Sequence, residues 1–323
     1  MSDKKRHSRI KRTPEDFKVS IMPRDLEVIK EVLDDGFLTT KQIQSLFFSS
    51  STSAIRRLQK LWNNGYLKRS YPVAFPPLAV YSPTRKGINL LVEEGVIEPD
   101  KVTWQSGHNR VKSNKTQHEL EANEIKVALT LSVREREDVE IILFDRGGAY
   151  WDRVKDPNPD DKEGGDYIPI RPDRFLYLRT EEGYVSFFVE VDRGTKPLSR
   201  FGRKIRGYRE YYFSGGFFKK YGEEGKRIED YPFRVLTTAL SEERRNNLVE
   251  QAIKEGSLQM CWFGVFSEVI ANPLGKVWVR GSEYKEVLEQ IPPQKREGIW
   301  GTYNKQERNK IIRDEVERHS ILE

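Results

Sequence analysis

Cysteine is nearly absent from this chain: Cys261 is the single one, which excludes an internal disulfide framework and any zinc site built from several cysteines. Its sequence neighbours are apolar, which favours a buried structural thiol over a nucleophile. No stretch approaches the roughly 20 apolar residues that a transmembrane helix needs, so we expect no membrane partner. No hydrophobic run follows the basic N-terminus, which argues against a secretion signal and for a cytoplasmic protein.

Two catalytic motifs are also missing. The four histidines, at positions 7, 108, 118 and 319, form no His-hydrophobe-His pair, so a rolling-circle initiator or relaxase is a poor interpretation. Tyr211 and Tyr212 would supply its tyrosines, but paired tyrosines on an amphipathic helix more often pack. The stretch 222–226 lacks the spacing of a Walker loop, so ATP is not expected.

Length and charge indicate more than one domain and a polyanionic partner. The chain has 323 residues, and its 16 Phe, 14 Tyr and 6 Trp are enough for two cores. The net charge is +6, which favours a polyanion over an acidic-surface partner. We expect a basic flexible arm at 1–20, a first domain at 21–97, a linker at 98–116, a second domain at 117–270 and a charged, helical C-terminal extension at 271–323.

The first domain has the pattern of a winged helix-turn-helix. Apolar residues at helical spacing predict three helices, beginning near residues 23, 39 and 50. In the third helix we expect Ile55, Leu58 and Leu61 to face inward. Two short strands joined by a proline-rich wing, and a closing helix at about 84–94, complete the domain.

The third helix and the base of the wing carry hydroxyl and basic side chains. In a helix-turn-helix the second helix of the pair enters the major groove, where such groups bind phosphates and guanine edges. The alternative is a winged helix that pairs only with protein. Because basic groups recur on helix, wing and arm, we favour double-stranded DNA as the partner, and a homodimer would suit a duplex reader. The candidate DNA-binding residues are Ser51, Thr52, Ser53, Arg56, Arg57, Lys60, Lys68 and Arg69.

The second domain has the pattern of a mixed α/β sheet. A long acidic insertion, rich in glycine and proline, fills 146–170. The predicted elements are a helix at 117–132, strands at 139–145, 173–179 and 184–191, a helix at 199–213, a strand at 232–238, a helix at 241–255 and a strand at 259–266.

A hairpin turn at 180–183 sets the register of two of these strands. A turn centred between 181 and 182 pairs residue 173 with 190, and likewise 175 with 188, 177 with 186 and 179 with 184. Because successive side chains alternate between the faces of a strand, three carboxylates project from one side of the sheet. They belong to Asp173, Glu190 and Asp192.

This acidic cluster needs a positive partner. Directly paired Cβ atoms lie roughly 5 Å apart, close enough for Asp173 and Glu190 to hold one divalent cation. Hard oxygen ligands suit Mg²⁺ or Mn²⁺. The alternative is neutralisation by a cation of the protein, Arg193 or Lys204, and the spacing leaves both open.

These residues resemble a known pattern. Pro172-Asp173 and Glu190 look like the acidic pair of the PD-(D/E)xK nuclease fold, a restriction-endonuclease-like mixed-sheet α/β domain. Over about 23–268 the chain is more specifically similar to the replication-relaxation family of mobile-element proteins. The resemblance rests on the winged helix, on His118-Glu119-Leu120 with Asn123, on Arg171-Pro172-Asp173, on Glu190-Val191-Asp192-Arg193-Gly194-Thr195, and on Lys204 with Tyr208.

The resemblance implies a DNA-binding protein of a plasmid, phage or integrative element, acting in replication initiation or mobilisation with other proteins of those processes. It also implies a candidate catalytic set of Asp173, Glu190, Asp192 and Lys204, with Asp173, Glu190 and Glu119 as metal ligands.

One departure from the nuclease pattern leads to two hypotheses about catalysis. The residue two past the glutamate is normally a lysine, but here it is Asp192, and Lys204 lies on the next helix. If the site works, the protein is a Mg²⁺-dependent endonuclease or nickase, in which metal-bound water attacks a phosphodiester. If Lys204 only neutralises Asp192, the domain is a nuclease fold used for binding. That next helix is also strongly basic and has only Glu210 as a nearby acid, so phosphate contact is expected along it.

Overall fold

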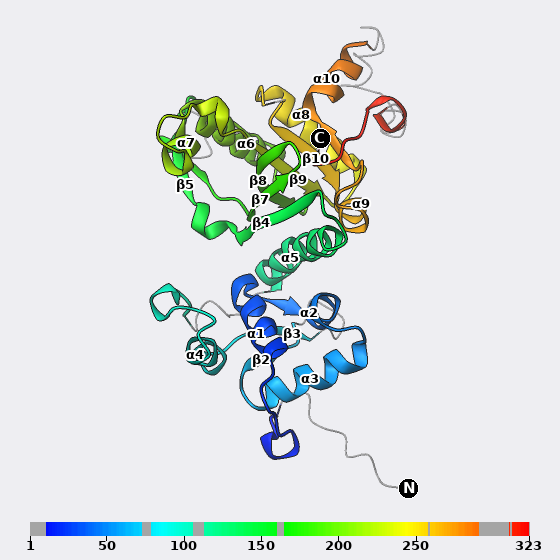
Figure 1. Ribbon diagram of the computed structural model, residues 1–323. Coiled ribbons are helices and arrows are strands. Elements are labelled where there is room, and N and C mark those ends of the chain that lie inside the picture. The colour runs from blue at the N-terminus through cyan, green and yellow to red at the C-terminus, as the bar shows by residue number, and fades with distance from the viewer. Residues whose placement is uncertain are drawn as a thin grey trace. The chain divides into compact units, whose positions relative to one another are not determined.

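The computed structural model describes residues 11–72, 79–105, 113–159, 165–257, 259–290, 310 and 312–322. The chain forms two compact units, residues 1–127 and 128–323, and both combine helices with sheet (Figure 1). The prediction of a mixed α/β protein is therefore confirmed. The predicted wing tip, the first ten residues of the predicted arm and residues 291–309 of the C-terminal extension lie outside the described residues.

The N-terminal unit contains the helices and the two strands predicted for it, and a short additional strand. Its antiparallel sheet has the order β1-β3-β2. In chain order the elements are α1 (Pro23–Asp35), β1 (Leu38–Thr39), α2 (Thr40–Phe47), α3 (Ser51–Asn63), β2 (Leu67–Ser70), β3 (Val80–Pro83) and α4 (Arg85–Glu93).

Hydroxyl side chains cap three of these helices. At the start of α2, Thr39 Oγ1 accepts a hydrogen bond from the amide of Gln42 at 3.2 Å. Ser50 Oγ accepts a hydrogen bond from the amide of Ser53 at 3.2 Å, and Thr84 Oγ1 accepts one from the amide of Gly87 at 3.0 Å. Each satisfies an amide that the first helical turn leaves without a partner. Gly65, with φ of +82°, turns the chain after α3 into β2.

The core of the N-terminal unit is built on one face of α3. Ala54, Leu58 and Leu61 are fully buried, and their spacing of four and three residues places them on one side of the helix. Ile55, in contrast, is 52% exposed. The prediction that Ile55 faces inward is wrong, because the neighbouring Ala54, although smaller, begins the buried stripe.

The segment 11–20 lies against α3. The amide of Thr13 donates to Asn63 Oδ1 at 2.7 Å, and Arg57 donates to the carbonyl of Ser20 at 2.7 Å. This half of the arm, which we expected to be flexible, is thus held by contacts to the helix.

Helix α5 (Ser113–Val133) begins earlier than the helix predicted from 117, and the division between the two units falls within it. Its first part packs in the N-terminal unit. Gln42 donates to the carbonyl of Leu120 at 3.0 Å, and Lys126 pairs with Glu31 at 2.8 Å and with Asp35 at 2.9 Å.

A six-stranded mixed sheet, with the order β11-β10-β9-β8-β7-β4, forms the centre of the C-terminal unit (Figure 1). Neighbouring strands run antiparallel except β8-β9 and β9-β10, which are parallel. The strands are β4 (Val139–Arg146), β7 (Arg174–Thr180), β8 (Gly183–Asp192), β9 (Phe233–Ala239), β10 (Cys261–Val265) and β11 (Trp278–Arg280).

Helices α6 (Leu198–Phe213) and α8 (Glu242–Lys254) form the crossovers that the parallel strands require. Both pack on one face of the sheet, where Ile205 and Leu248 join a core that includes Phe188 and Phe263. Cys261 lies in this core and is fully buried, so the prediction of a structural thiol is confirmed, and burial raises its pKa. The described residues of this unit also form the helices α7 (Gly216–Tyr221), α9 (Phe266–Ala271) and α10 (Gly281–Gln290).

The predicted register of the β7-β8 hairpin is confirmed. Residue 175 pairs with 188, 177 with 186 and 179 with 184. Asp173 lies immediately before β7, and its amide donates to the carbonyl of Val189 at 3.1 Å. Val189 pairs with Arg174, so the predicted direct pairing of Asp173 with Glu190 is not part of the strand ladder.

Two parts of the C-terminal unit were not predicted. The acidic insertion contains a hairpin of β5 (Asp152–Lys155) and β6 (Tyr167–Ile170), which packs on α6 through Ile168 and Ile170. The C-terminal extension, expected to be helical, supplies strand β11 as well as α10. All three strands are too short to leave a clear alternation in the sequence.

Candidate functional site

The predicted acidic cluster forms where β8 ends beside the start of β7. The Asp173 carboxylate turns back onto the strand, and its Oδ2 accepts a hydrogen bond from the amide of Val191 at 2.8 Å. Glu190 is 4% exposed. The hairpin therefore brings the two carboxylates together, as the register required.

Helix α6 supplies two partners to Glu190. Lys204 Nζ forms an ion pair with Oε2, and the Tyr208 hydroxyl donates to Oε1 at 2.5 Å. The two donors are four residues apart and so lie on one face of the helix. Both carboxylate oxygens of Glu190 are thus bound by the protein itself.

Burial governs the protonation of this trio. Burial, together with the charge of Asp173, raises the pKa of Glu190 to about 8, against the lowering effect of Lys204. Burial by itself would lower the pKa of Lys204, but the charges of Glu190 and Asp173 raise it above its ordinary value. Burial, together with the Glu190 charge, also raises the pKa of Tyr208 well above its usual value. Lys204 therefore stays cationic at neutral pH.

Asp192 has a different partner. Arg244, on α8, donates to Oδ1 through Nε at 2.7 Å and to Oδ2 through Nη2 at 3.1 Å. The amide of Gly194 adds a third hydrogen bond at 2.8 Å. Lys204 therefore pairs directly with Glu190 rather than with Asp192, whose direct partner lies 52 positions along the chain.

The residues present do not fit a bound divalent cation. The oxygens of Glu190 and Asp192 face an ammonium, a hydroxyl and a guanidinium, which supply the positive partners that a metal would otherwise provide. Across the described residues, no group of three or more Asp, Glu, His or Cys side chains is arranged to hold a metal. Glu119 belongs to the N-terminal unit, so its part in such a site stays a prediction.

Most basic residues of α6 pair with acids of the C-terminal unit, although Arg200 is exposed. Arg203 pairs with Asp156 at 3.1 Å, and Arg206 pairs with Glu255 at 3.0 Å. These acids come from the insertion and from the end of α8, so the sequence near α6 did not reveal them. The helix therefore presents far less free positive charge than we expected.

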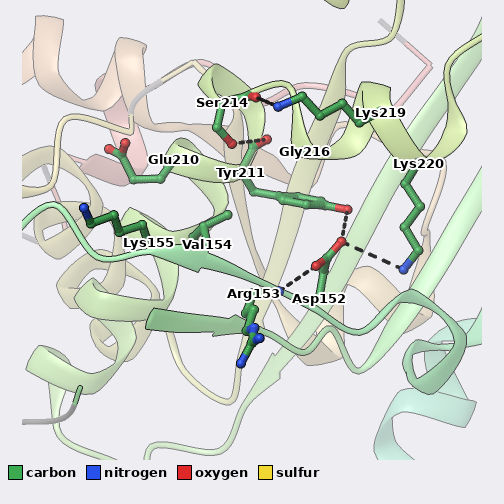
Figure 2. Close-up of a pocket in the computed structure, with 10 residues that line it drawn as sticks. All are labelled: Asp152, Arg153, Val154, Lys155, Glu210, Tyr211, Ser214, Gly216, Lys219 and Lys220. Carbon is green, nitrogen blue, oxygen red and sulfur yellow. Dashed lines mark hydrogen bonds and ion pairs between the residues drawn. The ribbon is translucent and has the colours of Figure 1, made fainter. Parts of the chain in front are cut away.

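A cavity of about 590 Å³ lies between β5 and the turn from α6 to α7 (Figure 2). Figure 2 shows the Asp152 carboxylate as its polar centre, bound by the Tyr211 hydroxyl at 3.0 Å and approached by Lys220 at 4.0 Å. Lys219 donates to the carbonyl of Ser214 at 3.1 Å. Burial raises the pKa of Tyr211, which makes its hydroxyl a poor nucleophile. Because these polar groups already satisfy one another, the cavity carries no functional assignment.

The N-terminal unit presents free cations on α3 and β2. Within the described part of the chain, the side chains of Arg56, Lys60 and Lys68 make no hydrogen bond or ion pair. Ser51 and Thr52 are exposed beside them at the start of α3. These five residues, which we call the α3–β2 surface, are the predicted DNA-binding side chains that remain available to a ligand.

Three other predicted DNA-binding residues have partners inside the unit. Arg57 binds Asp25, and the Ser53 hydroxyl accepts a hydrogen bond from Ser50 at 2.9 Å. The Arg69 guanidinium stacks on the ring of Trp62, 3.5 Å from its centroid. Arg57 and Arg69 are thus directed into the unit, which the sequence did not indicate.

Charge is distributed unevenly along the chain. Residues 36–92, which span α2 to most of α4, contain eight Lys and Arg and no Asp or Glu. The N-terminal unit has 22 Lys and Arg against 15 Asp and Glu, a net charge of +7, whereas the C-terminal unit has 34 against 35, a net charge of −1. The absence of acids from 36–92 is visible in the sequence, but our interpretation of the sequence considered only the basic residues.

The fold and the cluster define a two-unit mixed α/β protein with free cations on an acid-free stretch of one unit and an internally bonded acidic cluster in the other. The chain belongs to the replication-relaxation family, whose model matches residues 29–225, more than half of the sequence. No curated protein and no solved structure matches it. The match includes Glu190 and Lys204 but ends before Arg244. None of the described helices combines the length and the apolar character needed to cross a bilayer.

Proposed function

We propose that this protein binds double-stranded DNA of a plasmid, phage or integrative element and acts there in replication initiation or mobilisation. In this proposal the N-terminal unit is a winged helix that holds the duplex. The C-terminal unit is a nuclease-like fold used without catalysis. Membership of the replication-relaxation family supports the role in replication or mobilisation.

The order of elements supports the winged-helix interpretation. Three helices precede the β2-β3 hairpin, and β1 joins that hairpin in one antiparallel sheet. In a helix-turn-helix the second helix of the pair enters the major groove, and here that helix is α3.

The observation that carries DNA binding is the charge of the α3–β2 surface. Arg56, Lys60 and Lys68 have no ion-pair partner among the described residues, and no acid lies between positions 36 and 92. A surface of this kind attracts the phosphate backbone, because each cation that contacts a phosphate releases condensed counterions. An ordinary solvated surface mixes both signs of charge.

The non-catalytic interpretation of the C-terminal unit rests on its satisfied carboxylates. Glu190 is bound by Lys204 and Tyr208, and Asp192 is bound by Arg244. The alternative is a Mg²⁺-dependent endonuclease or nickase. The close approach of Asp173, Glu190 and Lys204 favours that alternative, but it requires Glu190 to exchange its present partners for a cation.

The proposal is tested by duplex binding of the full chain over a series of salt concentrations. We expect the logarithm of the affinity to fall linearly with the logarithm of the salt concentration. In a triple alanine variant of Arg56, Lys60 and Lys68, the slope should flatten by about 0.9 for each phosphate that the variant no longer neutralises.

The matched control is a triple alanine variant of three exposed lysines of the C-terminal unit, Lys155, Lys196 and Lys226, which removes the same amount of charge. We expect this control to bind like the unmodified protein. Duplex binding with no salt dependence, or equally weakened binding in the two triple variants, would show that the α3–β2 surface does not hold DNA.

A further inference from the structure

The outward face of α3 carries one large apolar side chain. Ile55 is 52% exposed and lies between Thr52, three residues before it, and Gln59, four residues after it. Arg56 is its immediate neighbour. An isolated exposed isoleucine is common on protein surfaces. Ile55 is of interest because Thr52 and Arg56 of the α3–β2 surface lie beside it.

A protein partner is a poor occupant for this face. A second copy of the chain would bring Arg56 and Lys60 against their own counterparts, with no acid on α3 to separate them. Like charges brought together across an interface are strongly unfavourable. An apolar patch for protein docking would also be wider than one side chain.

The major groove of DNA offers one apolar group, the 5-methyl of thymine. A β-branched side chain in a helix is held close to one rotamer, so the methyl groups of Ile55 are oriented before any ligand arrives. The flanking Thr52 and Arg56 provide a hydroxyl and a guanidinium for phosphates or neighbouring base edges. The face thus combines phosphate-binding groups with one apolar contact point.

We infer that Ile55 selects thymine at one position of the bound duplex through contact with its 5-methyl group. This inference rests on the proposed function and deepens it, because it names a base that the α3–β2 surface prefers. The side chain is exposed, so changing it leaves the core of the N-terminal unit intact.

The test begins with selection of a preferred duplex from a random-sequence pool by the full chain. Each thymine of that duplex is then replaced singly by deoxyuridine, which removes only the methyl group. We expect one replacement to weaken binding about fourfold, the value for one buried methyl group. In Ile55→Ala the replacement at that position should have no effect, whereas Ile55→Val, which retains β-branching, should keep part of it.

Arg56→Ala is the matched control on the adjacent residue. It should weaken binding to thymine and deoxyuridine duplexes by the same factor. Binding that is insensitive to deoxyuridine at every position, or a sensitivity that persists in Ile55→Ala, would overturn the inference and leave the proposed function standing. A failure of the unmodified chain to bind any duplex would overturn both.

Discussion

Arg57 on α3 donates to both carboxylate oxygens of Asp25 at the start of α1, and Asp25 is only 1% exposed. The same carboxylate accepts the amide of Met22 at 2.8 Å and so caps α1. The Asp25 carboxylate therefore links α1 to α3 and also stabilises the first turn of α1. The adjacent Arg56 points to solvent and makes no such contact in the described part of the chain.

Arg57→Ala should therefore reduce the stability of the protein, whereas Arg56→Ala should reduce its affinity for DNA. Arg57→Ala leaves a buried carboxylate without its counter-charge, and we expect a loss of about 3 kcal/mol in the free energy of unfolding. Arg56→Ala should change that free energy by less than about 0.5 kcal/mol while weakening duplex binding. Urea unfolding followed by tryptophan fluorescence, together with a binding titration, measures both. Equal stability of the two variants would contradict the assignment.

The C-terminal unit should not cut DNA. Because Lys204 and Tyr208 occupy the side-chain oxygens of Glu190, and Arg244 occupies those of Asp192, we expect supercoiled plasmid to remain intact in Mg²⁺ or Mn²⁺. The experiment includes Asp173→Ala and Glu190→Ala. Nicking by the unmodified protein that both substitutions abolish would establish the endonuclease alternative, whereas nicking that survives both would come from a contaminant.

The buried Glu190 should make stability depend on pH. Its pKa is about 8 in the folded protein against an ordinary value of 4.5, so the folded state binds this proton more tightly than the unfolded state. The contribution to stability is therefore complete below about pH 4.5 and is lost as the pH rises through 8. Glu190→Gln cannot ionise and should not show this fall. Parallel stability curves for the two proteins from about pH 5 to about pH 9 would contradict the shifted pKa.

Gly147 lies where the chain passes close to the acidic cluster. A Cβ atom at this position would lie 1.7 Å from the carbonyl oxygen of Pro172, which the backbone cannot accommodate without moving. We expect Gly147→Ala to lower the free energy of unfolding by about 2–3 kcal/mol or more. The matched control is Gly148→Ala, where the added Cβ would meet no atom within 4 Å, and thermal unfolding should show little change. Similar melting temperatures for the two variants would refute the predicted clash.

Sequence patterns predicted those features that short-range geometry sets. The β7-β8 hairpin follows from one turn and from the alternation of side chains, so its register, and with it the closeness of Asp173 to Glu190, could be predicted. Helical spacing likewise located α3 and α6, and the placement of Lys204 with Tyr208 on one face followed from their separation by four residues.

Only the tertiary structure decided which charges remain free. Arg56 and Arg57 are adjacent and chemically identical, yet the packing of α1 against α3 brings Asp25 to one of them alone. Arg244 reaches Asp192 from 52 positions away, because the α8 crossover returns the chain to the sheet. An ion pair depends on distance in space rather than in sequence, so local patterns could identify the charged residues but could not identify their partners.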